Sequence, residues 1–280
     1  MKHRDGMKPD ERIHLNYPVL LVHGMGFRDS AVFNYWGRIP KVLTELGCRI
    51  FYGQQDCNAE IAENGQAIAA RIDAILAETG AQKVNIIAHS KGGLDCRYAI
   101  STLGCGQKVA SLTTVSTPHN GSKTVDLLMD LPQPLIRFAG FCTDRWVRIL
   151  GDKRPNSYKV FHSLTTEAAA AFNRENPDDP SVYYQSYAFV MRSPFSDVFM
   201  WFPNLVVGLV EGENDGLLTP AAAKWGDFKG VYRGVGRRGV SHSDEVDMRR
   251  RRLSRKTGEG VSDILDVYRQ IVSDLHERGF

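Results

Sequence analysis

A serine between small residues is the first position in this sequence that could do covalent chemistry. Ser90 lies in the stretch AHSKGG (88–93), where the residues two before and two after the serine are alanine and glycine. Small residues at these places let a strand and a helix approach each other across a strained turn, the nucleophile elbow. The stretch predicts a serine nucleophile for acyl transfer; the alternative is a chance match of small residues around a serine.

A serine hydroxyl needs a base, and in elbow-type hydrolases an acid and then a histidine follow the serine along the chain. Four later histidines deserve comparison: His119 after an apolar run, His162 in a helical stretch, His242 in GVSHSD (239–244), and His276 at the polar end of the last helix. His242 is the one on a late loop that follows an acidic loop. We therefore expect His242 to be the general base.

The acidic loop EGENDG (211–216) supplies the third member of the set. It follows the apolar run 206–210, which resembles a strand, and Asp215 is the first choice for the acid, with Glu213 as the second. Acidic, glycine-containing loops are also common as plain turns, and that alternative stays open for Asp215.

Acyl transfer further requires two backbone N–H groups to stabilise an oxyanion. The residue after the nucleophile, Lys91, supplies one in an elbow-type hydrolase, and the loop after the first strand supplies the other. In the loop HGMG (23–26) we expect Met25 to be this second donor; the alternative is that His23 and Gly24 form only a tight turn.

The surrounding pattern is that of a parallel sheet with helices on both faces. Short apolar runs typical of buried strands occur at 19–22, 49–52, 84–88, 112–115, 184–190 and 206–210. Apolar residues recur at helical spacing in 61–76 and 261–275. This alternation predicts an α/β fold with a mostly parallel, doubly wound sheet, in one domain covering 1–280.

One stretch interrupts the alternation. Between 117 and 182 there is no strand pattern, yet apolar residues crowd into 127–150, so we expect an inserted helical lid or cap at about 120–181. A mobile, amphipathic lid would expose apolar surface on opening; a rigid cap packed on the core is the alternative.

Composition excludes several classes of protein. The 280 residues carry a formal charge of only +3 from 35 basic and 32 acidic side chains, which gives no basic footprint for nucleic acid. The start, 1–11, is polar, and no segment has the roughly 20 apolar residues of a membrane span. Five cysteines without metal-ligand spacing favour a reduced, cytoplasmic protein; export without a cleaved signal peptide is the alternative.

These motifs together resemble those of bacterial true lipases of the Pseudomonas and Burkholderia type, including a Proteus variant without a signal peptide. The stretches that carry the resemblance are, in chain order, YPVLLVHGM (17–25), KVNIIAHS (83–90), SLTT (163–166) with FN (172–173), NDGL (214–217) and HSDEV (242–246). The resemblance covers most of the chain and implies the α/β-hydrolase fold, with Ser90, Asp215 and His242 as the triad. Ala88 in place of glycine, the cysteine positions and the arginine run after Asp244 depart from that family.

The resemblance also implies a structural calcium ion. In such lipases an aspartate two residues after the catalytic histidine and another upstream of the acid bind Ca²⁺, and Asp244 and Asp197 stand near these two places. Because calcium takes six to eight oxygen ligands, carbonyls around Met248 and Arg252 and water would have to complete the site. The alternative is that both aspartates are ordinary surface acids, free or paired with the nearby arginines.

The function that these residues predict is hydrolysis of carboxylic esters, most directly of acylglycerols or other lipid esters, through an acyl-enzyme. No cofactor takes part in that chemistry, and the expected partner is a lipid or ester substrate, at a lipid–water interface if the lid is mobile. An esterase for soluble esters, a thioesterase or an acyltransferase could use the same triad. A binding module that keeps the pocket without the reaction is a further alternative.

Overall fold

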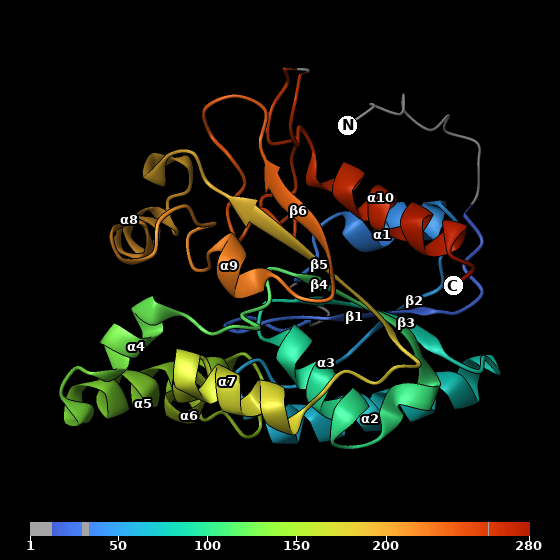
Figure 1. Cartoon of the computed structure of the whole chain (residues 1–280), viewed down its shortest axis with the longest axis horizontal. Coiled ribbons are helices and arrows are strands. Elements are labelled where there is room, and N and C mark those ends of the chain that lie inside the picture. Colours follow the sequence, from blue (N-terminus) through green and yellow to red (C-terminus); the bar gives the residue numbers. More distant parts are fainter. Residues whose placement is uncertain (1–12, 30–33, 257) are drawn as a thin grey trace.

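The structure is a computed structural model that describes residues 13–29, 34–256 and 258–280. The polar start expected at 1–11 lies outside these residues. Six strands form one sheet in which every neighbouring pair is parallel, in the order β2-β1-β3-β4-β5-β6 (Figure 1). Their bounds are β1 Val19–Val22, β2 Ile50–Tyr52, β3 Val84–His89, β4 Val109–Val115, β5 Tyr183–Val190 and β6 Asp227–Arg233.

Helices cover both faces of this sheet. Figure 1 shows α1 (Ile39–Glu45) and α10 (Ile264–Glu277) on one side, and α2 (Ile61–Thr79) and α3 (Gly92–Ser101) on the other. Alternate residues of each strand face opposite sides, so Leu21 packs with α1 and α10 while Leu20 packs with α2 and α3. Two apolar cores therefore fix the central strands, at whose carboxyl ends the loops gather.

Five of the expected strands are present, the first with the expected bounds and the other four with ends shifted by one to three residues, but the sixth is wrong. Residues 206–210 belong to helix α8 (Trp201–Val210), in which the buried side chains Asn204 and Val207 stand three residues apart. A short apolar run does not by itself distinguish a strand from a helix. The true last strand, β6, was not predicted, because it is an edge strand interrupted by Gly230 at a φ of +109° and carries charged residues.

Helices occupy the interval between β4 and β5. They are α4 Lys123–Met129, α5 Gln133–Ile149, α6 Ser157–Ser163 and α7 Thr166–Glu175. In α5, Ile136, Gly140 and Val147 are buried against the protein. The opposite side of this helix exposes large apolar side chains, namely Leu135, Phe138, Phe141, Trp146 and Ile149.

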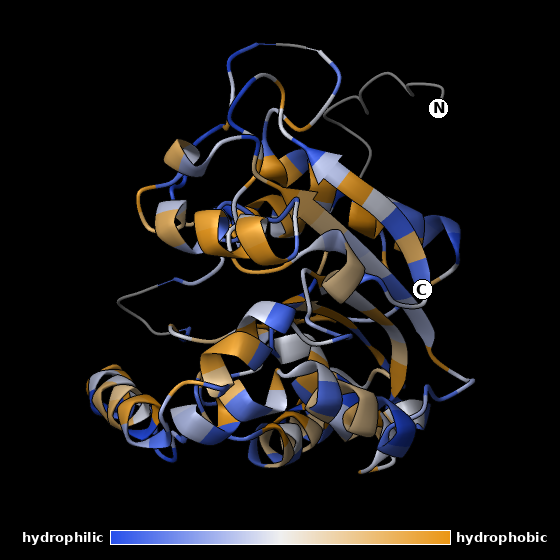
Figure 2. Cartoon of the chain, turned by 60° about the vertical axis from the view of Figure 1, so that its left-hand side comes forward, coloured by the Kyte–Doolittle hydropathy of each residue, from blue (hydrophilic) through white to orange (hydrophobic). Residues whose placement is uncertain are grey.

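A second exposed apolar surface lies on α8 and the segment before it. Its exposed side chains are Phe195, Val198, Phe199, Trp201, Phe202, Leu205, Leu209 and Val210. Figure 2 shows α8 as a mostly hydrophobic helix, and α4 packs beside it. In the described part of the chain, no helix combines the length and the apolar character that a bilayer crossing requires.

Candidate active site

Ser90 sits on a strained turn between β3 and α3. Its backbone φ is +54°, a left-handed value that is unusual for a residue with a side chain. Two hydrogen bonds hold this turn. The Ser90 N–H donates to the carbonyl of Val115, the last residue of β4 (3.0 Å), and the hydroxyl of Thr117, in the loop after β4, donates to the Ser90 carbonyl (2.7 Å). Strain held in this way is typical of functional residues.

Gly92 explains why a small residue follows the nucleophile by two places. A Cβ at this position would lie 2.5 Å from the His23 carbonyl oxygen and 2.9 Å from that of Val22. The start of α3 thus passes directly against the end of β1, which brings the loop after β1 beside Ser90. On the other side of the serine, the Ala88 methyl is accommodated in the core between the sheet and its helices.

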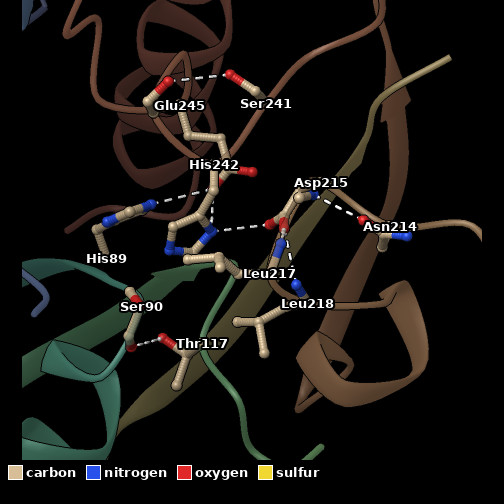
Figure 3. Close-up of polar contacts among 12 residues, drawn as sticks. His89, Ser90, Thr117, Asn214, Asp215, Leu217, Leu218, Ser241, His242 and Glu245 are labelled. Atoms are coloured by element: carbon tan, nitrogen blue, oxygen red, sulfur yellow. Dashed lines mark hydrogen bonds and ion pairs between the residues drawn. The ribbon is translucent and has the colours of Figure 1, made fainter. Parts of the chain in front are cut away.

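His242 and Asp215 meet above this turn. The His242 Nδ1 lies 2.9 Å from Asp215 Oδ2, and the two loops are also joined by a backbone bond from the His242 N–H to the Asp215 carbonyl (2.8 Å). Figure 3 shows the imidazole between Asp215 and Ser90. With its Nδ1 proton on Asp215, the imidazole keeps Nε2 free to accept a proton from the serine side.

Asp215 is held ionised despite its burial. Its Oδ1 accepts the backbone N–H groups of Leu217 and Leu218, both at 2.8 Å. Burial by itself raises the pKa of the carboxyl, but the interaction with His242 and these hydrogen bonds outweigh burial and lower the pKa. An ionised, immobile carboxylate is what an orienting acid requires.

The loop that carries Asp215 is anchored to helix α8 and to the end of β5. The Asn214 carbonyl accepts the Met191 N–H (2.8 Å), directly after β5, and the Asn204 side chain on α8 donates to Asn214 Oδ1 (2.7 Å). Asp215 therefore reaches His242 although the element before it is not the expected strand.

The loop after β1 lies against the nucleophile. A Cβ on Gly24 would be 2.7 Å from the Ser90 Cβ, so glycine is required for this close approach. Met25 follows Gly24 in this loop, and Lys91, directly before α3, has a fully buried side chain that pairs with Asp95 (2.6 Å). The residues expected to supply the two N–H groups are thus the direct chain neighbours of Gly24 and of Ser90.

Three buried residues near the site were missed by the sequence reasoning. Tyr35, His89 and Glu245 form a chain in which the Tyr35 hydroxyl lies 2.7 Å from His89 Nδ1 and His89 Nε2 lies 3.1 Å from Glu245 Oε2. Glu245 Oε2 is also 3.8 Å from His242 Nδ1. Glu245 belongs to the family-like stretch 242–246, and that is the one signal that pointed to it.

The other candidates lie elsewhere. Glu213 is exposed and pairs with Arg233 (2.6 Å), and His119 is buried under Trp225, 3.0 Å from the Thr114 hydroxyl. His162 is exposed on α6, and His276 is exposed at the end of α10.

Asp197 and Asp244 come together, but their surroundings do not fit calcium. Asp197 lies 2.8 Å from Arg249 Nη2 and accepts the hydroxyls of Ser241 and Ser243, while Asp244 lies 2.7 Å from Arg238 Nη2. Calcium needs oxygen atoms with free lone pairs. Here guanidinium, hydroxyl and amide donors take up the carboxylate oxygens.

Comparisons with known proteins assign the chain to a family. Residues 18–192 match the family described as palmitoyl protein thioesterase. The chain is 31% identical over 260 residues to triacylglycerol lipase 2 of Saccharomyces cerevisiae. The aligned region covers 88% of this chain and 74% of the yeast protein. The chain is 38% identical over 261 residues to a triacylglycerol lipase of Vibrio cholerae, at 82% and 80% coverage. The chain belongs to the lipase and palmitoyl protein thioesterase family of α/β-hydrolases.

The fold of this lipase-family chain is shared with solved structures. The mature Bacillus licheniformis lipase BlEst2 superposes with a TM-score of 0.67 at 21% identity, covering 98% of this chain and 96% of that one. The expected α/β-hydrolase fold is therefore confirmed, and so is the expected class of activity, carboxylic-ester hydrolysis.

Proposed function

We propose that this protein is a lipase of the Pseudomonas and Burkholderia type that cleaves acylglycerol or other lipid esters with Ser90, His242 and Asp215. The observation that carries the proposal is the 2.9 Å contact between His242 Nδ1 and Asp215 above the strained Ser90 turn. Triads are recognised by such geometry and by the role of each group.

In the first half of the reaction, the Ser90 Oγ attacks the ester carbonyl carbon while His242 Nε2 takes the hydroxyl proton. The carbonyl oxygen becomes an oxyanion, which the N–H groups of Met25 and Lys91 stabilise. Asp215 holds the ring in the required tautomer and stabilises the imidazolium. The C–O bond to the alcohol then breaks, the alcohol leaves with the proton from His242, and the acyl group stays on Ser90.

In the second half, water replaces the alcohol. His242 removes a proton from the water as the water oxygen attacks the acyl carbon, and the same two N–H groups stabilise the second oxyanion. The ester bond to Ser90 breaks, the fatty acid leaves, and the proton returns to the Ser90 oxygen. Every step uses side chains and N–H groups of this chain.

The apolar surfaces favour a lipid over a soluble ester. Exposed apolar side chains gather on α5 and on α8, and α4 contacts both of these helices (Figure 1). Contiguous exposed apolar surface of this kind marks contact with lipid or with a partner. We therefore propose a lipid–water interface as the place of action, with α4 to α7 as the lid.

A thioesterase is the second candidate, because residues 18–192 match the palmitoyl protein thioesterase family. The same acyl-enzyme would form from a thioester, with a thiol as the leaving group. A lipase should cleave an oxygen ester faster than a thioester, and a thioesterase should do the reverse, so the two rates distinguish the candidates.

The test is a set of p-nitrophenyl esters of increasing chain length, together with emulsified triglyceride and a palmitoyl thioester. A lipase should prefer long chains and should release fatty acid from the emulsion; faster cleavage of the thioester would favour the second candidate. Activity confined to acetate esters would contradict both. Labelling by an organophosphonate, lost in Ser90→Ala, separates an enzyme from a binding module.

A further inference from the structure

Two buried carboxylates brace the loop that carries His242. Ser241 and Ser243, the residues on either side of this histidine, both donate their hydroxyls to Oδ2 of Asp197, at 2.6 and 2.5 Å. The other oxygen, Oδ1, accepts the Phe199 N–H (2.9 Å). A single side chain from the segment before α8 thus holds both neighbours of the proposed base.

The second carboxylate, Asp244, faces the same region. Its Oδ2 accepts the Ser241 N–H (3.2 Å), and its two oxygens lie 2.8 and 2.7 Å from Arg238 Nη2. Asp197 and Asp244 are both almost completely buried. Two buried negative charges at one loop are unfavourable unless positive charge is placed beside them.

Arg249 supplies this positive charge and lies between Asp197 and Asp244. Its Nη2 lies 2.8 Å from Asp197 Oδ2 and donates to the Ser196 carbonyl (3.1 Å), and its Nε lies 3.6 Å from Asp244 Oδ1. A guanidinium group is permanently charged, planar and able to serve several acceptors in fixed directions. It is therefore suited to hold two carboxylates and a carbonyl at once.

We propose that Arg249, supported by Arg238, is a positioning residue for His242 and takes the place that a structural calcium ion would have. The guanidinium neutralises Asp197 and Asp244, so that Asp197 stays ionised and keeps both serine hydroxyls. The inference rests on the proposed role of His242, but the expected effect of Arg249 on stability does not depend on that role. It predicts a loop that needs no divalent cation.

The experiment compares the wild type with Arg249→Met and Arg249→Lys, and with Arg251→Met as a control, an exposed arginine of the same run. The melting temperature is measured with millimolar CaCl2 and with EDTA, and kcat and KM are measured on a soluble ester. We expect the wild-type melting temperature to be the same in both conditions, because the cation is part of the chain.

Arg249→Met should lower the melting temperature by about 5 °C or more, because it leaves the buried Asp197 carboxylate without its cation, while Asp244 keeps Arg238. Its kcat should fall about tenfold with KM little changed, as expected when a base is misplaced and substrate binding is not. Arg249→Lys should recover part of both losses, and Arg251→Met should match the wild type.

A wild-type protein that calcium stabilises and EDTA inactivates would overturn the proposal. So would an Arg249→Met variant with unchanged melting temperature and kcat. If Arg249→Met does not fold, Arg249→Lys measured against Arg251→Lys decides the same question. Inactivity of the wild type on every ester would refute the proposed function instead, and the melting temperatures would still test the role of Arg249.

Discussion

Glu245 is joined to His89, the residue directly before the nucleophile, by a 3.1 Å contact between Oε2 and Nε2. The Tyr35 hydroxyl accepts the Gly24 N–H (3.1 Å) and lies 2.7 Å from His89 Nδ1. In the tautomer with its proton on Nε2, His89 accepts the Tyr35 hydroxyl and donates to Glu245. One chain of hydrogen bonds thus runs from the loop after β1, past the nucleophile, to the loop of His242.

The first prediction concerns the charge of Glu245. Burial, followed by the nearby Asp215, raises the pKa of this carboxyl well above its ordinary value, which favours its neutral form. Glu245→Gln should therefore keep near-normal stability and activity. Glu245→Leu should lose about 1–3 kcal/mol in the free energy of unfolding, because the His89 N–H is left without an acceptor. Equal losses in both variants, measured by urea denaturation, would show that the charge is needed.

The second prediction tests the triad. Ser90→Ala and His242→Ala should each lower kcat by about a millionfold, because the members of a triad act as a unit. Circular dichroism and the melting temperature should show a folded protein, and Ser101→Ala, at the other end of α3, should remain active. Near-normal turnover in either folded triad variant would refute the assignment.

A third prediction concerns the apolar side of α5. Phe138→Ser and Phe141→Ser should lower the rate on emulsified triglyceride by about tenfold each, since each change removes an aromatic side chain that would be buried in lipid. The rate on a short, soluble ester should not change. Leu103→Ser, at an exposed apolar position beyond the far end of α3, is the control. An equal loss on both substrates would mean that α5 supports the fold and does not contact the lipid.

The fourth prediction uses the approach of Gly24 to the nucleophile. In Gly24→Ala the new Cβ would lie 2.7 Å from the Ser90 Cβ, so we expect about 1–3 kcal/mol of destabilisation and a fall in kcat. Gly208→Ala is the matched control. Its Cβ on α8 would meet one atom at 3.7 Å, and the added helix propensity should leave stability equal or slightly higher. If Gly24→Ala behaves like the control, the close approach has no functional role.

The fifth prediction concerns pH. Burial lowers the pKa of His23 to about 4, and the ring nitrogens lie close to the carbonyl oxygens of Gly24 and Gln55. Between about pH 6.5 and pH 4 the imidazole therefore takes up a proton in the unfolded chain but not in the folded chain. The free energy of unfolding should fall as the pH falls through this window, by about 3 kcal/mol for this group. His23→Gln should show a shallower fall when unfolding is followed from pH 7 to 4, whereas His276→Gln, an exposed site, should match the wild type.

Local sequence was sufficient for the central part of the fold and for selecting the three candidate residues that the structure brings close together. Val19–Val22 matches its strand, and the elbow stretch 88–93 is identified by its own residues, because buried strands and strained turns are determined by hydrophobicity and side-chain size over a few positions. Ser90, Asp215 and His242 could be chosen because chain order limits the candidates.

Only the tertiary structure decided what depends on distant neighbours. The run 206–210 is helical because Asn204 and Val207 pack inward at helical spacing and Asn204 anchors the acid loop, and none of these contacts is local. Likewise, the ion pair of Arg249 with Asp197 joins residues that are 52 positions apart in the sequence (249 − 197). Sequence supplied the carboxylates, but whether they face a metal ion or a guanidinium depends on how three loops pack, since burial and charge pairing are properties of the folded chain.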